Sequence, residues 1–187
     1  MSKCGDIKYE NLEWCDGEMS LPGIRPKVYA TSKRNIVKFP TLPKTFTTAL
    51  GEIATYDGDF ELAQDAVWYE IGVVDFRSGV TSESQGTRPS KSFLNTGTFV
   101  HAGTDCNATG FARQANNDDL VYLFQEKGGR FRVIGNEMYQ TDTAPAQDLG
   151  TEATSEKGTT FVATVTDVCP APFYTGEVLT ADGDANA

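Results

Sequence analysis

Long apolar runs, histidine clusters and paired cysteines are missing from this 187-residue chain. No apolar stretch approaches the ~20 residues that a transmembrane helix needs, so we expect no contact with a membrane. One histidine and four cysteines without a CxxC pair leave no zinc-binding spacing. Cys4 and Cys15 could approach each other, but free thiols are the default in a reducing compartment. We therefore predict no metal and no cofactor.

Motifs that carry catalysis are missing as well. There is no Walker A sequence and no GxGxxG, and Gly128-Gly129 lies between two strand-like runs and leads into no helix. His101 lacks the nucleophile elbow and the glycine turn of a hydrolytic site. Acidic pairs such as Asp57 and Asp59 are usually solvated turn residues. The sequence therefore favours a binding or structural protein over an enzyme.

The chain is long enough for one domain with a proper core. Its hydrophobic content of 39 % is low, which predicts long loops or tails, whereas 11 % aromatic residues argue against a wholly disordered chain. The N-terminus has lysines but no apolar run after them, so we expect no signal peptide and synthesis in a cytoplasm. We divide the chain into an N-terminal arm (1–24), a β domain (25–176) and a flexible acidic tail (177–187).

Most of the β domain is patterned as strands, at residues 27–31, 35–39, 67–76, 92–101 and 158–167 and in a hairpin over 120–135. Residues 67–76 are apolar on both faces, which predicts a strand in the centre of a sheet. Residues 80–89 fit an edge strand or a loop, and 136–157 a turn-rich linker. A helix is expected within 103–119, where Ala108, Phe111, Ala112 and Ala115 recur at helical spacing. About eight strands and one helix predict a mainly β fold, an antiparallel β-barrel or β-sandwich with one short flanking helix.

The hairpin has the sequence LVYLFQEKGGRFRVIG from Leu120 to Gly135. A two-residue turn at Gly128-Gly129 would place Lys127 opposite Arg130 and Phe124 opposite Val133. The first strand is then apolar on both sides, as expected in mid-sheet. The like-charge pair beside the turn is tolerable only in solvent or next to an acidic partner.

The strand at 158–167 alternates almost strictly between two kinds of side chain. One face carries Thr160, Val162, Thr164 and Thr166, and the other carries Phe161, Ala163 and Val165. Such a pattern predicts one side packed in the core and one side open to water or to a neighbour.

Charge is segregated along the sequence, which has a net charge of −10. Six bases and no acid lie between Arg25 and Lys44, and seven acids and no base between Glu52 and Asp75. The two stretches suit a self-complementary contact between copies, with plain solubility as the alternative. The candidate inter-subunit residues are Arg25, Lys27, Lys33, Arg34 and Lys38, and the candidate acidic face, a lumen or a partner surface, comprises Glu52, Asp57, Asp59 and Glu61.

Several short segments follow one another in a distinctive order over residues 25–175. TSESQGTRP (81–89) is followed by SFLN (92–95), a short helix, the hairpin ending at Asn136, and GTTFV (158–162) before PAPFY (170–174). This order resembles a bacteriophage virion protein of the tail-tube type found in phages of gut Bacteroidetes. The resemblance implies a β-barrel or sandwich that assembles into rings, most readily hexamers, whose inner sheets form a continuous tube.

In that family the rings stack through loops and terminal arms, and DNA passes through an acidic lumen without sticking. The net negative charge fits this role, because like charges prevent adhesion to DNA. The resemblance also implies other tail or connector proteins as partners and a location in the virion. If the basic segment meets acids of the next ring, charge reversal at Lys33 and Arg34 should impair polymerisation.

Two other functions fit the same sequence. A head–tail connector or short-tail ring protein belongs to the same class. A carbohydrate-binding or host-adhesion module belongs to another class, and aromatics exposed on one face would favour it. Trp14, Trp68 and Tyr69 could form a sugar platform, although core packing is the commoner role at this spacing.

Overall fold

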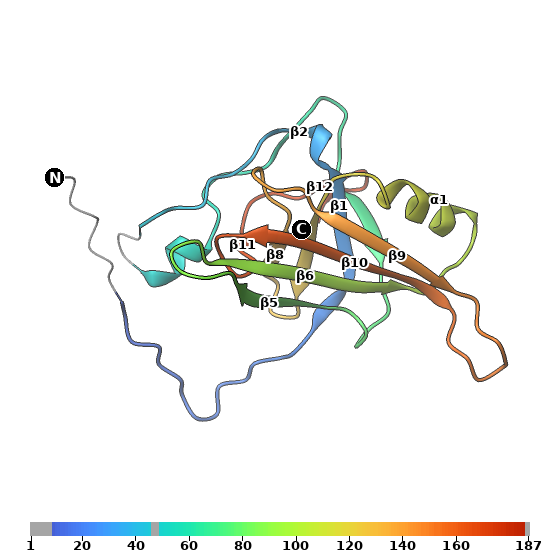
Figure 1. The fold of residues 1–187 in the computed structure, drawn as a ribbon, viewed down its shortest axis with the longest axis horizontal. Coiled ribbons are helices and arrows are strands. Elements are labelled where there is room, and N and C mark those ends of the chain that lie inside the picture. Colours follow the sequence, from blue (N-terminus) through green and yellow to red (C-terminus); the bar gives the residue numbers. More distant parts are fainter. Residues whose placement is uncertain (1–8, 46–48, 186–187) are drawn as a thin grey trace.

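The computed structural model describes residues 9–45 and 49–185, which form two antiparallel sheets, one α-helix and several short elements (Figure 1). The five-stranded sheet has the order β11-β8-β7-β1-β4, with β1 (Ile24–Ser32), β4 (Tyr69–Gly72), β7 (Leu120–Glu126), β8 (Phe131–Ile134) and β11 (Phe173–Tyr174). The four-stranded sheet has the order β5-β6-β10-β9, with β5 (Gly79–Gln85), β6 (Ser92–His101), β9 (Asp142–Asp148) and β10 (Gly158–Asp167). The other elements are β2 (Ile36–Lys38), β3 (Glu61–Leu62), β12 (Leu179–Thr180), β13 (Gly183–Asp184), the 3₁₀ turns η1 (Lys33–Asn35) and η2 (Leu50–Ala54), and helix α1 (Cys106–Ala115).

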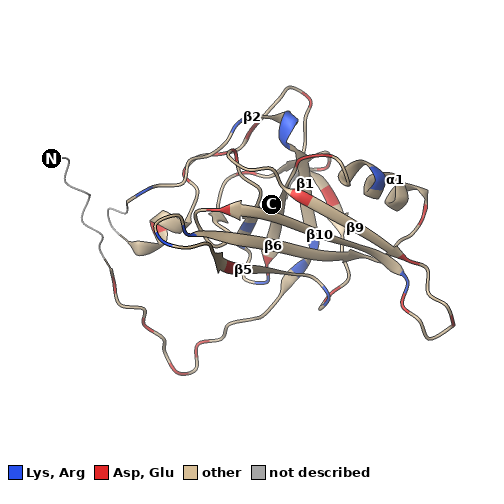
Figure 2. Cartoon of the chain, in the orientation of Figure 1, with Lys and Arg blue, Asp and Glu red and all other residues tan. Residues whose placement is uncertain are grey.

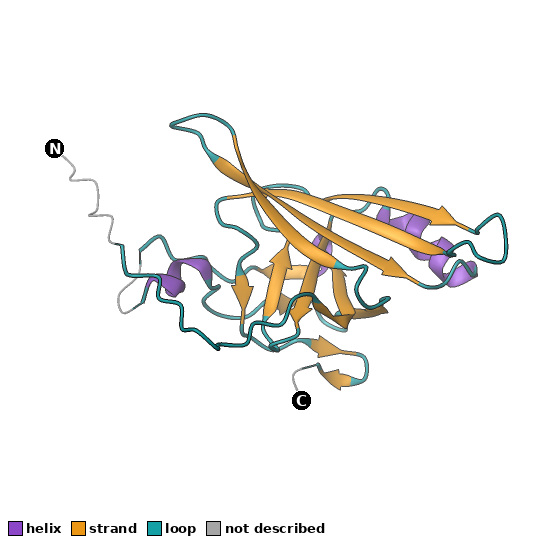
Figure 3. Cartoon of the chain, turned by 90° about the horizontal axis from the view of Figure 1, so that it is seen from below, coloured by secondary structure: helices purple, strands orange, loops and turns teal. Residues whose placement is uncertain are grey.

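The two large sheets are stacked, and their strands cross steeply (Figure 1). The β12–β13 hairpin lies beyond the five-stranded sheet, on the side away from the four-stranded sheet (Figure 3). Each large sheet ends in two edge strands, so neither closes into a barrel. The predicted mainly β, antiparallel sandwich with one helix is therefore confirmed, and the barrel alternative is wrong because no described strand joins the edges of either sheet into a closed ring.

A core of aromatic side chains fills the space between the two sheets. The rings of Phe99 and Phe161 stack with centroids 4.9 Å apart, and Phe124 meets Phe99 edge-on at 5.9 Å. Phe161, Ala163 and Val165 of β10 all point into this core, as their alternation predicts.

A second core covers the other face of the five-stranded sheet. Leu123 and Val133 belong to it, together with Phe60, Trp68 and Val178 from segments outside the two large sheets. The five-stranded sheet is thus buried on both faces, which explains the two apolar faces of β7 and its position in mid-sheet.

The β7–β8 hairpin has a three-residue loop, whereas the sequence suggests two residues. Gly129 has φ 96° and donates its N–H to the Glu126 carbonyl at 2.8 Å, while Glu126 N–H donates to the Arg130 carbonyl at 2.8 Å. Phe124 consequently faces Arg132, and the predicted pairing with Val133 is wrong by one residue. This shift of one residue turns each β8 side chain to the face opposite the predicted one. It also places Glu126 opposite Arg130 in place of the predicted like-charge pair, and these two side chains form an ion pair.

Two other segments differ from prediction. Of residues 67–76, four form the edge strand β4, because Trp68 packs into one core while the chain after Gly72 leaves the sheet. The expected linker 136–157 contains β9, where Pro145 is tolerated because an edge strand does not need every N–H.

The helix and both ends of the chain complete the fold. Asp105 Oδ1 accepts the Ala108 N–H at 2.9 Å and so caps α1. The described part of the arm, residues 9–23, forms no strand and extends away from the sheets (Figure 1). The segment expected to be a flexible tail instead docks: Val178 is fully buried, and Trp68 N–H donates to the Leu179 carbonyl at 2.9 Å.

Two glycine substitutions test this packing. A Cβ at Gly97 of β6 would clash with the Phe124 ring, whereas a Cβ at Gly110 of α1 meets nothing within 4 Å. We expect Gly97→Ala to lower the free energy of unfolding by about 1–3 kcal/mol through overpacking. Gly110→Ala should raise it by about 0.5–1 kcal/mol. Urea unfolding followed by circular dichroism measures both; a harmless Gly97→Ala would contradict the inter-sheet packing.

Candidate functional site

Threonines and other small side chains cover the outer face of the four-stranded sheet, which we call the threonine face. Pairing in the ladders places Thr81, Thr96 and Thr164 in one row across β5, β6 and β10. The face comprises Thr81 and Glu83 of β5, Leu94, Thr96 and Thr98 of β6, Thr160, Val162, Thr164 and Thr166 of β10, and Asp142, Ala144 and Ala146 of β9.

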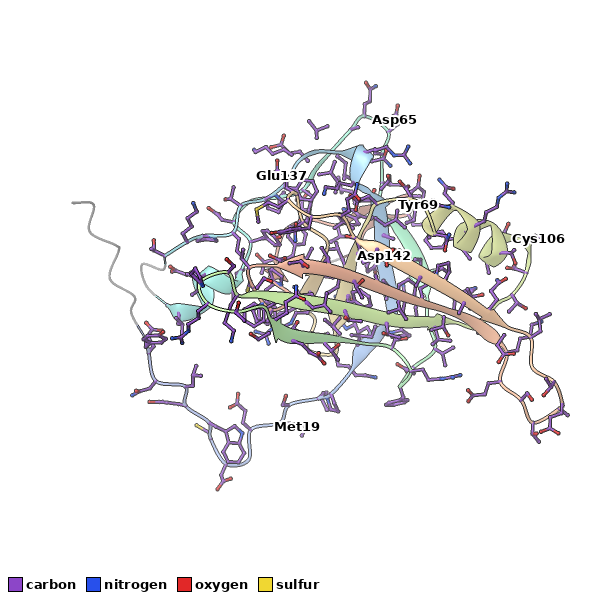
Figure 4. The ribbon with its side chains drawn as sticks, viewed as in Figure 1. Met19, Asp65, Tyr69, Cys106, Glu137 and Asp142 are labelled. Carbon is purple, nitrogen blue, oxygen red and sulfur yellow. The ribbon has the colours of Figure 1, made fainter. Side chains whose placement is uncertain are left out.

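None of the four strands of this sheet contains a lysine or an arginine. Figure 2 shows them almost uncharged, with acidic residues at a few positions only. Asp142, one of these acids, lies at the start of β9 (Figure 4). The face therefore offers nothing to neutralise a phosphate.

The two edge strands of this sheet, β5 and β9, are seven residues long each. Because each has only one strand neighbour among the described residues, the backbone N–H and C=O groups on its other side make no ladder hydrogen bonds there. The five-stranded sheet differs, since its edges β4 and β11 have only four and two residues. The long edges can therefore pair with another strand.

The predicted basic set is largely paired within its own chain. The pairs are Lys27–Glu70 at 3.0 Å, Lys33–Asp119 at 3.4 Å, Arg34–Asp118 at 2.7 Å and Lys38–Glu61 at 2.6 Å. Hydrogen bonds to their carboxylate partners raise the pKa of Lys27 and of Lys38. Arg25 forms no ion pair with the described residues.

The predicted acidic set lies away from the threonine face, in or beside short elements between β2 and β4. Glu61 meets a member of the basic set, Lys38, but within one copy. Asp59 accepts the Tyr174 hydroxyl at 3.4 Å and the Glu177 N–H at 3.3 Å, so it holds the C-terminal segment in place. Asp57 pairs through its backbone with Thr41, and Glu52 lies in η2.

An apolar groove of about 1010 Å³ opens where β10 ends. Its lining includes Phe39, Leu42, Ile53, Phe93, Met138 and Val168. Asp167 also lines the groove and is only 3 % exposed. Its Oδ1 accepts the Val168 N–H at 2.6 Å, whereas Oδ2 has no hydrogen-bond partner among the described residues.

Burial controls the titration of this groove. It raises the pKa of Asp167, because the charged carboxylate is poorly solvated. Burial, and then the charge of Asp167, raise the pKa of Cys169 to about 11. The same two causes raise the pKa of Tyr56. No thiolate is available for chemistry here at neutral pH.

The other candidate residues are dispersed. His101 Nδ1 lies 2.7 Å from the Gly72 carbonyl and joins two segments of the fold. Trp68 is buried, so it cannot form a sugar platform with Trp14 and Tyr69. Cys15 and Cys169 form no disulfide with another described residue, and the suggested pairing of Cys15 involves Cys4, which lies outside the described residues.

Two further features concern the described residues only. They contain no group of three or more His, Cys, Asp or Glu placed to hold a metal ion. None of their helices has the length and apolarity to cross a membrane.

Comparison with known proteins gives no match among family models, curated proteins or solved structures. Function is therefore inferred from the geometry of this chain.

Burial of the Asp167 carboxyl should make the stability of the protein depend on pH. Its raised pKa means that the folded protein binds more protons than the unfolded chain, so stability falls as the pH rises through the window between the two pKa values. Asp167→Asn should therefore be more stable than the wild type at pH 7, and this difference should disappear below the ordinary aspartate pKa of about 4. Urea unfolding of both proteins at each pH measures the difference. An equal difference at both pH values would show that burial of charge is not its cause.

Proposed function

We propose that this protein is a structural virion subunit that assembles into stacked rings, forming a tail tube through which DNA passes. The observation that carries the proposal is the four-stranded sheet, whose two long edges pair with no other described strand and whose strands contain no basic residue. A head–tail connector or short-tail ring would use the same two features.

Strand direction supports ring formation. Every neighbouring pair in the order β5-β6-β10-β9 is antiparallel, so β5 and β9 run in opposite directions. When β9 of one copy meets β5 of the next, the new pair is antiparallel as well, and the alternation continues from copy to copy. Such a contact joins two different surfaces of the subunit. It closes into a ring when a whole number of copies, each rotated by the same angle, completes a full turn.

The threonine face supports a lumen. In a closed ring of these sheets, one face of the sheet lines the inside, and the opposite face is already packed against the five-stranded sheet. Short neutral side chains with a few acids, such as Glu83 and Asp142, give passing phosphates no cation to bind. The inside of the ring is therefore the threonine face.

Edge-to-edge pairing can be tested with cysteines placed on the outer face. Thr81→Cys on β5 and Ala144→Cys or Ala146→Cys on β9 would meet across the joint, because side chains opposite each other in a ladder lie about 5 Å apart. Mild oxidation should give a covalent ladder of copies for one of these pairs, with rings or tubes in negative-stain microscopy. Each single-cysteine variant is the control for the native thiols. A protein that remains monomeric at all concentrations and forms no ladder would refute the proposal.

A second experiment tests the lumen. Thr96→Lys with Thr164→Lys places two cations in the middle of the threonine face. We expect wild-type assemblies to release DNA during sedimentation at low salt and the double variant to retain it, with retention lost as salt increases. Val37→Lys with Leu179→Lys adds the same charge at exposed positions outside the four-stranded sheet. Equal DNA retention by both double variants would contradict a luminal threonine face.

A further inference from the structure

The N-terminal arm carries large apolar side chains that lie in solvent. Tyr9, Leu12, Trp14, Met19 and Leu21 are each more than half exposed, and none of them belongs to either core. Met19 lies on the arm, away from both sheets (Figure 4). Exposed apolar residues gathered on one segment mark an interaction site, so the arm needs a surface that covers them.

A hydrogen bond joins the outer end of the described arm to the apolar groove. Glu10 Oε2 accepts the Leu50 N–H at 2.8 Å. Leu50 begins η2, where the N-cap residue Ala49 makes no side-chain hydrogen bond, so Glu10 satisfies an N–H group that the turn itself leaves unpaired. Leu50 also lines the apolar groove, together with Ile53 of the same turn. The arm is thus held at the rim of the groove.

The root of the arm lies beside a second point of the same groove. Residues 18–21 and 23–24 line a separate hollow of about 750 Å³, and Pro170 and Ala171 line it with them. Pro170 lines the apolar groove as well. The arm is therefore held near the groove at both of its ends, and the stretch between them can close over it.

The spacing of the apolar residues suits such a closure. Alternate side chains of an extended segment point the same way. Leu12 and Trp14 would then lie on the same side as Glu10, whose carboxylate already meets the groove rim, whereas Asn11 and Glu13 would face outward. Four extended residues span about 13 Å, so Trp14 reaches past the rim.

The groove offers what an indole ring requires. Its lining is mainly apolar, and its volume of about 1010 Å³ matches pockets that hold drug-sized molecules. Asp167 lines it, is 3 % exposed and has an Oδ2 without a hydrogen-bond partner among the described residues. A buried tryptophan N–H needs an acceptor, and a buried carboxylate oxygen needs a donor. Trp14 and Asp167 each supply what the other lacks.

We propose that the arm is a strap that closes over the apolar groove of its own copy, with Leu12 and Trp14 inserted and the Trp14 indole N–H donating to Asp167 Oδ2. In the structure the strap is open and held by Glu10. Closure covers the apolar side chains of the arm and the lining of the groove together, so it withholds both surfaces from other copies. The strap belongs to one copy and does not depend on the proposed ring.

Acidic residues of the arm do not prevent this contact. The groove lining includes Glu137 and Asp167 but also Lys44, which forms no ion pair with another described residue. Glu10 accepts a backbone N–H at the rim, and Glu13 lies on the outward side of an extended arm. Insertion therefore brings neither carboxylate of the arm to Asp167.

Hydrogen exchange of the Trp14 indole N–H tests the closed strap. The protein has two tryptophans, and Trp14→Phe assigns their NMR signals. In dilute protein the Trp14 indole should exchange about tenfold more slowly than in the urea-unfolded chain. Glu10→Ala should remove this protection, and Glu10→Gln, which keeps an acceptor, should retain it. Glu13→Ala is the matched control, and the signal of the buried Trp68 shows that each variant is folded. Exchange as fast as in the unfolded chain would overturn the inference.

Changes in the groove should have the same effect as loss of the Glu10 contact. Met138→Glu places a charge at an exposed position of the lining, and Asp167→Ala removes the acceptor. In each variant the Trp14 indole should exchange about tenfold faster while the Trp68 signal persists. Leu149→Glu, at an exposed position between β9 and β10, is the control and should keep the protection. Wild-type protection in either groove variant would contradict the inserted indole.

Crosslinking shows whose groove the strap closes. A photoreactive benzoylphenylalanine at position 14, in a dilute mixture of isotopically light and heavy copies, should link to residues 39–44, 136–138 or 167–170 of its own copy. Links between light and heavy copies, or links to surfaces outside the groove, would overturn the inference. The ring is tested separately, because pairing of β5 with β9 needs no residue of the arm.

Discussion

Burial of β7 on both of its faces is the constraint on which the rest of this structure depends. Four consecutive side chains, Val121 to Phe124, have no exposed surface, so the chain must supply one cover for each face. The four-stranded sheet covers one face, and the segments around Phe60, Trp68 and Val178 cover the other. The irregular segments and the C-terminal hairpin are used on that second face, and no other described strand pairs with the two edges of the four-stranded sheet.

The edge strands of the two sheets differ in length, and this difference bears on the proposed assembly. The five-stranded sheet ends in strands of four and two residues, which offer little for another chain to pair with. The four-stranded sheet ends in two seven-residue strands that run in opposite directions. Natural proteins usually protect such long edges, so their retention in one sheet favours a role in pairing between copies.

Local sequence patterns correctly predicted the elements that pack against a single core. The alternation in β10 follows from one buried face and one open face, and α1 follows from its apolar residues at helical spacing. The hairpin register was wrong because Gly128-Gly129 permits loops of two or three residues, and only the pairing of Glu126 with Arg130 distinguishes them. Residues 67–76 were placed in mid-sheet because a segment that serves two separate cores has the same pattern as a central strand.

The candidate site depended on contacts that no local pattern contains. Lys33 and Arg34 have partners at Asp119 and Asp118, more than 80 residues away, so the basic stretch gave no sign of being paired within the chain. β9 has small and polar side chains and is a strand because β10 provides a long partner. Its role in the threonine face was therefore missed, and a better signal would have been the absence of bases from four segments of similar length.

In the proposed tube, the composition of the face that lines the lumen matters more for contact with DNA than the net charge of the chain. At physiological ionic strength the interaction between exposed charges decays over about 8 Å of solvent, so groups on a surface act on a nearby phosphate more strongly than exposed charges farther away. In the proposed tube, a passing phosphate would meet the threonine face itself, which has few acids and no base in its strands. Such a surface neither binds the strand nor repels it strongly, and this is the condition for passage without adhesion.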